Sequence, residues 1–242
     1  MEKISGKVSE MTSGVGLAGE PLIGVPELKR IDGFKALARR DYAHDSIGLA
    51  QSLVGKYLFY RGVILRVTET EAYRGSDDPA SHAYRGKTKR NAAMFAGPGH
   101  LYVYLSYGMH HCINAVGQEA GGASGVLIRS GAVASIARDG ARSEISVATR
   151  RPVDLSRSAI GPGRLGRLVG ARREDSGYDL CGADSEIFFF SLSDGAVRLH
   201  CSPRIGVGSG VEKQWRFFEA DSSHLSGGGS SRLGAPLGSV SN

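Results

Sequence analysis

The stretch KYLFYRGVILRVTETEAY, residues 56–73, constrains the fold more than any other part of the chain. β-Branched and aromatic residues flank the dipeptide Arg61-Gly62, a pattern typical of two antiparallel strands joined by a tight turn. Further β-rich segments follow in the order GHLYVYLSYGMHHCINAV, GGASGVLIRSGAV, EIFFFSLS, SPRIGVG and QWRFFEA. The sequence therefore predicts a sheet of antiparallel neighbours.

Helical spacing is confined to short segments. HDSIGLAQSLVGK predicts a helix with Asp45 or Ser46 at its N-cap and Gly55 at its end. PGRLGRLVGA predicts another, with Pro162 near its start and Gly170 near its end. A third short helix is expected around PELKRIDGFKALARR. Clustered strands with few helices favour an α+β fold.

The two ends of the chain differ from its middle in composition. Residues 1–40 mix Gly, Ser, Lys and Glu without clear periodicity, and we expect a flexible N-terminal arm there. Residues 221–242 are rich in Ser and Gly and predict a disordered tail. Residues 41–220 remain as a single folded domain.

Charge and cysteine content narrow the function classes. The 242 residues carry a formal net charge of +6, which favours a polyanionic partner. The three cysteines are widely spaced and form no disulfide framework, so a reducing compartment is expected. We find no secretory signal and no run of about 18 apolar residues, so neither secretion nor a membrane span is predicted.

A carboxylate-rich strand is the first candidate for chemistry. Strand alternation would place Val67, Glu69, Glu71 and Tyr73 on one face. Glutamates on a strand ordinarily face water, but Tyr73 and the nearby His82 favour a pocket lined by aromatic rings. A partly dry carboxylate in such a pocket suits a general base or a stabiliser of an oxocarbenium ion. Alternation alone does not choose between Glu69 and Glu71.

The histidines and tyrosines are further candidates for function. The histidines and their cysteine neighbour lack the spacings of zinc sites, so we predict no metal; they are His82, His100, His110, His111 and Cys112. Tyr102 and Tyr104 share one strand face, and core packing explains much of that pattern. Tyr107, in contrast, precedes Gly108 where the alternation breaks, and a ring on such a turn can act as a wedge in a base stack.

Two basic runs, RGKTKR and RLGRLVGARRE, resemble the phosphate footprint of a protein that binds nucleic acid. The sequence contains no GxxxxGK[ST] motif and no GxSxG motif. Nucleotide hydrolysis and α/β-hydrolase chemistry therefore lose support.

Five blocks of the chain resemble those of the alkyladenine (3-methyladenine) DNA glycosylase family, also called methylpurine DNA glycosylases. They are VTETEAYRGSDDPASHAY, NAAMFAGPGHLYVYLSYGMHHCINAV, GVLIRS, IGPGRL and PRIGVG…WRFF, in the order and near the spacing of the family, over about residues 45–219. The resemblance implies a single mixed domain around a curved antiparallel β-sheet with a few short helices. It also implies a monomer that needs no metal or organic cofactor.

The resemblance assigns roles residue by residue. Glu71 matches the general base that activates the attacking water, and Arg129 matches an arginine that helps to hold this water. Tyr107 matches the tyrosine wedged into the gap that a flipped base leaves. The remaining matches line the base pocket (Tyr73, His82, Tyr104 and Asn114, the last crowding the guanine amino group) or contact DNA phosphates (Thr88, Arg90 and Arg164).

Two departures from the family pattern bear on DNA contacts. The basic loop after His82 is one residue shorter than the family form, which affects the phosphate contacts of that loop. His110 replaces an aromatic residue that often follows the wedge, which alters the fit to the minor groove.

The implied function is that of a monofunctional DNA glycosylase acting on damaged purines in double-stranded DNA. It would excise 3-methyladenine, 7-methylguanine, hypoxanthine and ethenoadenine by base flipping and Glu-activated water, which starts base excision repair. The resemblance places such an enzyme at the bacterial nucleoid in the cytoplasm or in a eukaryotic nucleus. A non-catalytic damaged-DNA-binding module is the alternative, and both this module and a metal-dependent hydrolase rank behind the glycosylase.

Overall fold

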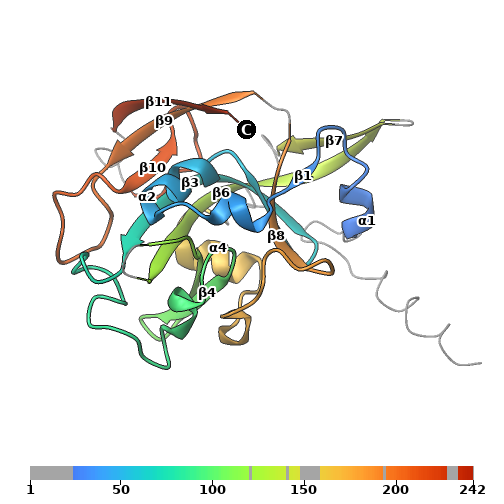
Figure 1. Cartoon of the computed structure of the whole chain (residues 1–242). Coiled ribbons are helices and arrows are strands. Elements are labelled where there is room, and N and C mark those ends of the chain that lie inside the picture. The colour runs from blue at the N-terminus through green and yellow to red at the C-terminus, as the bar shows by residue number, and fades with distance from the viewer. Residues whose placement is uncertain are drawn as a thin grey trace, which may run out of the picture.

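The predicted hairpin forms the centre of a large antiparallel sheet (Figure 1). Its strands are β2 (Tyr57–Tyr60) and β3 (Val63–Arg74), which pair antiparallel. Arg61 and Gly62 between them have φ angles of 45° and 94°. Both values lie in the left-handed region that a two-residue hairpin turn requires, so the predicted turn is confirmed.

The computed structural model describes residues 24–119, 122–139, 142–147, 159–192, 195–227 and 234–241. The α-helices there are α1 (Val25–Leu28), α2 (Ser46–Leu53) and α4 (Pro162–Leu168), and the 3₁₀ helices are η1 (Arg39–Tyr42), η2 (Ala92–Phe95) and η3 (Arg173–Asp175). The remaining strands are β1 (Lys35–Ala36), β4 (Leu101–Ser106), β5 (His110–Ala115), β6 (Ser124–Asp139), β7 (Arg142–Val147), β8 (Ile187–Ser191), β9 (Ala196–Ser202), β10 (Arg216–Glu219) and β11 (Ala235–Ser241).

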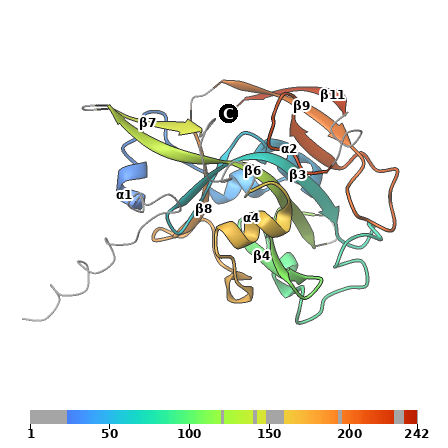
Figure 2. The same ribbon diagram turned by 180° about the vertical axis from the view of Figure 1, so that it is seen from behind.

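Within these residues eleven strands form one sheet, and every pairing is antiparallel. One path runs β1-β8-β2-β3-β10-β9-β11, while β6 pairs with β3 and carries β5, β4 and β7. The sheet curls through the long strands β3 and β6, as the two opposite views show (Figures 1 and 2). The predicted fold class, α+β around a curved antiparallel sheet, is confirmed.

Two compensating bulges interrupt the β3–β6 ladder. Val67 pairs with Gly131 and Glu69 with Ser130, so Thr68 is the extra residue on β3. The next pair joins Thr70 to Ile128, so Arg129 is the extra residue on β6. Bulges bend a strand and re-aim side chains, and here they lie at the carboxylate-rich part of β3.

The two predicted helices of the core are confirmed. The Asp45 side chain caps α2 by accepting a hydrogen bond of 2.7 Å from the Gly48 N–H. Leu49 and Leu53 of α2 are buried against the sheet. α4 begins with Pro162 at its first turn and packs against β5 and β6. No helix of the described residues has the length and apolar character needed to cross a membrane.

Residues 24–40 of the predicted N-terminal arm pack against the sheet, while residues 1–23 lie outside the described part. Leu28 and Ile31 are buried, and the Phe34 ring lies 5.1 Å from the ring of Phe190 on β8. The sequence predicted a longer helix here, but α1 ends at Leu28 and residues 35–36 form strand β1 on β8. These apolar contacts hold the segment against the sheet.

The described residues of the predicted tail, 221–227 and 234–241, also contact the sheet. Leu225 is 2% exposed, and β11 pairs with β9 at the edge of the sheet. The predicted strand SPRIGVG is wrong, because only its first residue, Ser202, belongs to β9. The rest forms a loop in which Arg204 turns inward to pair with Asp78 and Gly206 adopts a φ of 76°.

Gly166 is the point of closest approach between α4 and the sheet. A Cβ atom at this position would lie 1.9 Å from the backbone oxygen of His111 on β5. Gly166→Ala must therefore push α4 away from β5, and we expect a loss of about 1–3 kcal/mol in unfolding free energy. Urea unfolding measures this loss, with Gly208→Ala as the matched control because no atom lies within 4 Å of its Cβ. Equal stability of the two variants would contradict the close packing.

Candidate active site

A pocket of about 370 Å³ opens beside the C-terminal half of β3. Its walls come from β3, from β4, from the loop between β3 and η2, and from the loop between β9 and β10, which lie next to one another in both ribbon views (Figures 1 and 2). It is lined by Tyr73, Pro79, Ala80, His82, Arg90, Met94, Tyr102, Tyr104, Ser106, Tyr107, Asn114, Gly206, Val207, Gly208 and Ser209. In the described residues, therefore, the pocket brings together three stretches of the chain, residues 73–94, 102–114 and 206–209.

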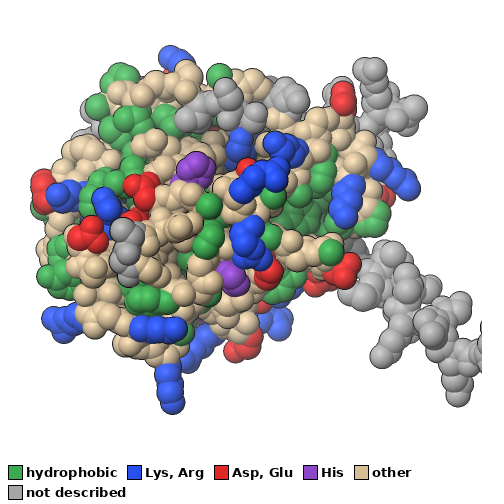
Figure 3. Space-filling model, in the orientation of Figure 1, with side chains coloured by type: hydrophobic (Ala, Val, Ile, Leu, Met, Phe, Trp, Pro, Cys, Tyr) green, Lys and Arg blue, Asp and Glu red, His purple; other side chains and the backbone are tan. Residues whose placement is uncertain are grey.

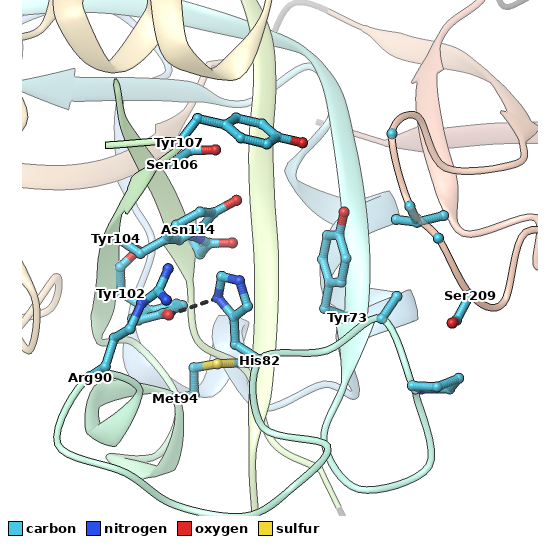
Figure 4. A pocket seen from close by; sticks show the side chains of 15 residues that line it. Tyr73, His82, Arg90, Met94, Tyr102, Tyr104, Ser106, Tyr107, Asn114 and Ser209 are labelled. Atoms are coloured by element: carbon cyan, nitrogen blue, oxygen red, sulfur yellow. Dashed lines mark hydrogen bonds between the residues drawn. The ribbon is translucent and has the colours of Figure 1, made fainter. Parts of the chain in front are cut away.

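Aromatic rings face one another across this pocket. Tyr73 stands on one side, with His82 and Tyr104 on the other (Figure 4). The His82 ring meets Tyr104 edge-on at 4.5 Å, and its Nδ1 lies 2.9 Å from the Tyr102 hydroxyl oxygen. Partial burial and the positive charge of Arg90 lower the pKa of His82, so its imidazole is neutral at pH 7.

Asn114 forms the deeper wall of the pocket. Its side chain is 3% exposed, and Nδ2 donates a hydrogen bond of 3.1 Å to the backbone oxygen of Tyr102. That bond fixes the orientation of the amide. On β6, a Cβ atom at Gly125 would come within 3.2 Å of Met94 Cε and 3.9 Å of Asn114 Oδ1. A larger residue there would therefore crowd two side chains that line the pocket.

Glu71 lies directly behind Tyr73 and is inaccessible to solvent. Its Oε2 accepts hydrogen bonds from the Tyr73 hydroxyl at 2.8 Å and from Arg129 Nη1 at 3.1 Å. Its Oε1 accepts a bond of 2.7 Å from the backbone N–H of Ile205. Three donors therefore hold both carboxylate oxygens, and Tyr73 connects the carboxylate to the pocket.

Glu69 is also fully buried, but it has a richer set of donors. Arg216 Nε donates to Glu69 Oε1 at 2.6 Å and Arg129 Nε donates to the same atom at 3.1 Å. The Ser130 hydroxyl and the Ser226 N–H donate to Oε2 at 2.7 and 2.6 Å. Two carboxylates and two guanidinium groups thus form one buried cluster.

The pKa values of the two glutamates are shifted in opposite directions. Burial raises the pKa of Glu71, and the opposing effects of Arg129, the Ile205 N–H and Tyr73 do not cancel it. Burial acts on Glu69 too, but Arg216, Arg129 and the Ser226 N–H outweigh it and lower the pKa. Neighbouring acids with separated pKa values can take different roles, one a fixed anion and the other a proton acceptor.

Arg204 braces the pocket from behind. It forms a bidentate ion pair with Asp78 at 2.6 and 2.8 Å, and both side chains are inaccessible to solvent. Its guanidinium lies 4.7 Å from the centre of the Tyr73 ring and 5.0 Å from that of Trp215. Stacking of this kind fixes the ring of Tyr73, and the loop that follows Arg204 presents the Ile205 N–H to Glu71.

Tyr107 projects from the tip of the β4–β5 hairpin. The side chain is 88% exposed, and its backbone φ of 48° is rare for a residue other than glycine. The neighbouring Met109 is 71% exposed. The hairpin thus presents two large side chains to solvent, and Tyr107 lines the edge of the pocket (Figure 4).

The three candidate phosphate contacts occupy different places. Thr88 stabilises the basic loop, since its N–H donates to Asn91 Oδ1 at 2.6 Å and its hydroxyl accepts from the Asn91 N–H at 3.3 Å. Arg90 lines the pocket itself, and Arg164 is exposed on α4. Lys and Arg side chains project from much of the face seen in Figure 3, interspersed with Asp and Glu. No cluster of three or more His, Cys, Asp or Glu in the described residues is arranged to hold a metal ion.

Comparison with known proteins agrees with this arrangement. The model of the family described as methylpurine-DNA glycosylase (MPG) matches residues 40–223. The chain belongs to this family. Relatives named "Putative 3-methyladenine DNA glycosylase" include one from Frankia casuarinae, 41% identical over 77% of this chain and 90% of its own length. One from Cutibacterium acnes is 38% identical over 77% of this chain and 97% of its own length. One from Desulfitobacterium hafniense is 37% identical over 79% of this chain and 98% of its own length.

For this member of the methylpurine-DNA glycosylase family, the structure brings most of the sequence-predicted residues together. Tyr73, His82, Tyr104, Asn114 and Tyr107 all line the pocket, and Glu71 and Arg129 lie in contact behind it. Arg164 does not line it. The residues that sequence reasoning missed include the buried side chains of Asp78, Arg204, Arg216 and Ser226. The segments SPRIGVG and QWRFFEA each contain one arginine, and an inward-facing arginine would indicate a buried ion pair. No local sequence pattern shows that these arginines face inward.

The separated pKa values predict opposite effects of pH on stability. The pKa of Glu69 in the folded protein lies below the ordinary value of 4.5. Its ionisation therefore adds to the free energy of unfolding above pH 4.5, and this gain is lost as the pH falls through the folded pKa. The pKa of Glu71 in the folded protein lies above 4.5, so the chain takes up a proton when it folds. The contribution of Glu71 to the free energy of unfolding therefore grows as the pH falls towards 4.5.

We therefore expect the loss of unfolding free energy in Glu69→Gln to be largest near neutral pH and to shrink in acid. For Glu71→Gln we expect the opposite trend: the unfolding free energy of the wild type should rise relative to that of the variant as the pH falls. Urea unfolding of the three proteins from pH 7 to 4 measures both slopes. Parallel curves for the two variants would contradict the assignment.

Proposed function

We propose that this chain is a monofunctional DNA glycosylase that excises alkylated and deaminated purines from double-stranded DNA. The observation that carries the proposal is a buried glutamate, Glu71, held by Arg129 directly behind an aromatic pocket of about 370 Å³. The names of its relatives point to 3-methyladenine as one base to be released. The net charge of +6 suits a DNA substrate.

Base recognition would use the facing aromatic rings. A flipped purine fits between Tyr73 on one side and His82 with Tyr104 on the other, and an N-alkylated purine is cationic. A cation over aromatic faces gains about 0.5–2 kcal/mol, more as water leaves the site. Because His82 is neutral, it does not oppose the charge of the base. Positive charge also makes the base a better leaving group, so binding and chemistry select the same lesions.

Two groups would refine this selection. Asn114, fixed by its bond to the Tyr102 carbonyl, would crowd the amino group that normal guanine carries. A neutral lesion such as hypoxanthine lacks the charge and needs a hydrogen bond in its place. Within the described residues the backbone N–H of His82 donates no hydrogen bond, whereas its carbonyl oxygen accepts one from Asn91 Nδ2. That N–H is the donor we propose for hypoxanthine.

Hydrolysis would depend on Glu71. The N-glycosidic bond breaks, the base leaves with the bonding electrons, and the sugar becomes an oxocarbenium-like cation. Anionic Glu71 stabilises this charge, orients water for attack at the sugar C1′ and accepts its proton. Because the Tyr73 hydroxyl holds Glu71 Oε2 on the side of the pocket, water must replace that hydrogen bond in the productive complex. Arg129, bonded to the same oxygen, would help to hold the water.

The duplex would be held open by the hairpin tip. Flipping a nucleotide costs a few kcal/mol, least where pairing is already weak. Tyr107, with 88% of its side chain exposed, would fill the vacated space in the stack. Thr88, Arg90 and Arg164 would contact phosphates around it. No lysine lines the pocket in the described residues, which supports hydrolysis without a Schiff base and an intact abasic product.

Replacement of Glu71 tests the chemistry. We expect Glu71→Gln to slow release of 3-methyladenine and hypoxanthine from duplex DNA by on the order of 10²–10⁴-fold, because the general base is lost. Single-turnover release in the presence of EDTA measures this, with Glu186→Gln as control because its carboxylate is exposed at the start of β8. Equal release by wild type and Glu71→Gln would place the base elsewhere. Lesion binding without release by the wild type would indicate a damaged-DNA-binding module.

Replacement of Tyr107 tests the wedge. Loss of one stacked aromatic ring should weaken binding to lesion-containing duplex by about 1–3 kcal/mol. Tyr107→Ala should bind single-stranded lesion DNA as the wild type does, because no stack needs to be held open. Leu105→Ala, an exposed side chain on the same hairpin, is the control. Equal losses on duplex and single strand would contradict a wedge.

A further inference from the structure

Three residues near the C-terminus, His224–Ser226, are packed against the candidate catalytic cluster. We call them the C-terminal strap. Leu225 and Ser226 are 2% and 5% exposed, although the sequence places them in a Ser/Gly-rich tail. The family match ends at residue 223, so the strap lies beyond it. Burial of a polar segment is unfavourable unless its polar groups are hydrogen-bonded.

The strap is bound at both bulges of the β3–β6 ladder. Thr68, the extra residue on β3, donates its hydroxyl proton to the backbone oxygen of His224 at 2.6 Å. Arg129, the extra residue on β6, donates to Ser226 Oγ from Nε at 3.1 Å and from Nη2 at 3.0 Å. The strap therefore holds the two residues that depart from the regular pairing.

Ser226 joins the two arginines to Glu69. Its hydroxyl donates to Glu69 Oε1 at 2.8 Å while accepting from Arg129, and its N–H donates to Glu69 Oε2 at 2.6 Å. Its backbone oxygen accepts from Arg216 Nη2 at 3.3 Å. The side chain thus uses all three of its hydrogen-bonding directions on the cluster. Arg129 in turn reaches Glu71 through the remaining nitrogen, Nη1, at 3.1 Å.

From this geometry we infer that Ser226 is a positioning residue for the hydrolytic step, acting through Arg129 on Glu71. It occupies the Nε and Nη2 edge of the guanidinium, which leaves Nη1 directed at Glu71. The inference rests on the proposed function. Without the hydroxyl, Nη2 loses its acceptor and Nε keeps only Glu69 Oε1, so the position of Arg129 over Glu71 is held less firmly. A small displacement of a catalytic group lowers a rate without weakening substrate binding.

Ser226→Ala tests the inference, because it removes the hydroxyl but keeps the N–H that binds Glu69. The matched control is Ser185→Ala, a serine of 9% exposure whose hydroxyl donates to the Asp179 carbonyl and touches none of the cluster. Single-turnover release of purines from DNA treated with a methylating agent gives the rate. Binding to a duplex with an abasic analogue gives the affinity, and thermal unfolding gives the stability.

We expect Ser226→Ala to release purines on the order of 10- to 100-fold more slowly than wild type, with affinity and unfolding midpoint equal to those of Ser185→Ala. In an Arg129→Ala background, Ser226→Ala should cause no further loss of rate, because its route is already absent.

Three results would overturn the inference. They are an unchanged rate in Ser226→Ala, an equal loss of rate in Ser185→Ala, and a full additional loss in the Arg129→Ala background. A wild type that releases no purine would refute the proposed function and the positioning role together. A wild type that releases purine beside an equally fast Ser226→Ala would remove the positioning role alone.

Discussion

The rest of the site depends on the burial of two glutamates beside two arginines at the centre of the sheet. Glu69, Glu71 and Arg216 are inaccessible to solvent, and Arg129 is 7% exposed. An unpaired charge in such a place costs several kcal/mol, so each member requires the others in position. The members come from β3, β6 and β10, and β3 pairs with both of the other strands. Misplacement of one strand would therefore leave a buried charge without its partner.

The two bulges explain how a sheet can direct so many groups at one carboxylate. In a regular strand, Arg129 and Ser130 would point to opposite faces, yet both contact Glu69. The bulge at Arg129 removes it from the alternation and turns its side chain towards the cluster. The compensating bulge at Thr68 restores the register, so the Glu71 and Tyr73 end of β3 keeps its ordinary alternation along the pocket wall.

Local patterns predicted much of this fold, and contacts across the sheet explain what they missed. The turn at Arg61, the cap at Asp45 and the exposed ring of Tyr107 each follow from a few neighbouring residues. The different surroundings of the two glutamates do not, because Arg216 and Ser226 reach Glu69 from 147 and 157 residues away. Composition likewise predicted disorder in a tail whose place is set by those hydrogen bonds.

Tyr73 connects the pocket to the chemistry behind it. Its ring lines the pocket, while its hydroxyl donates to Glu71 Oε2, the oxygen that Arg129 also binds. Arg204 stacks against the ring, and the N–H of the next residue, Ile205, holds the other oxygen of Glu71. A base that packs on Tyr73 therefore acts on the hydrogen bonding of Glu71 as well. In the free protein three donors hold the carboxylate and oppose the effect of burial, so displacement of one of them would raise the pKa of Glu71 further. A base bound in the pocket would therefore affect proton transfer to Glu71, because Tyr73 contacts both.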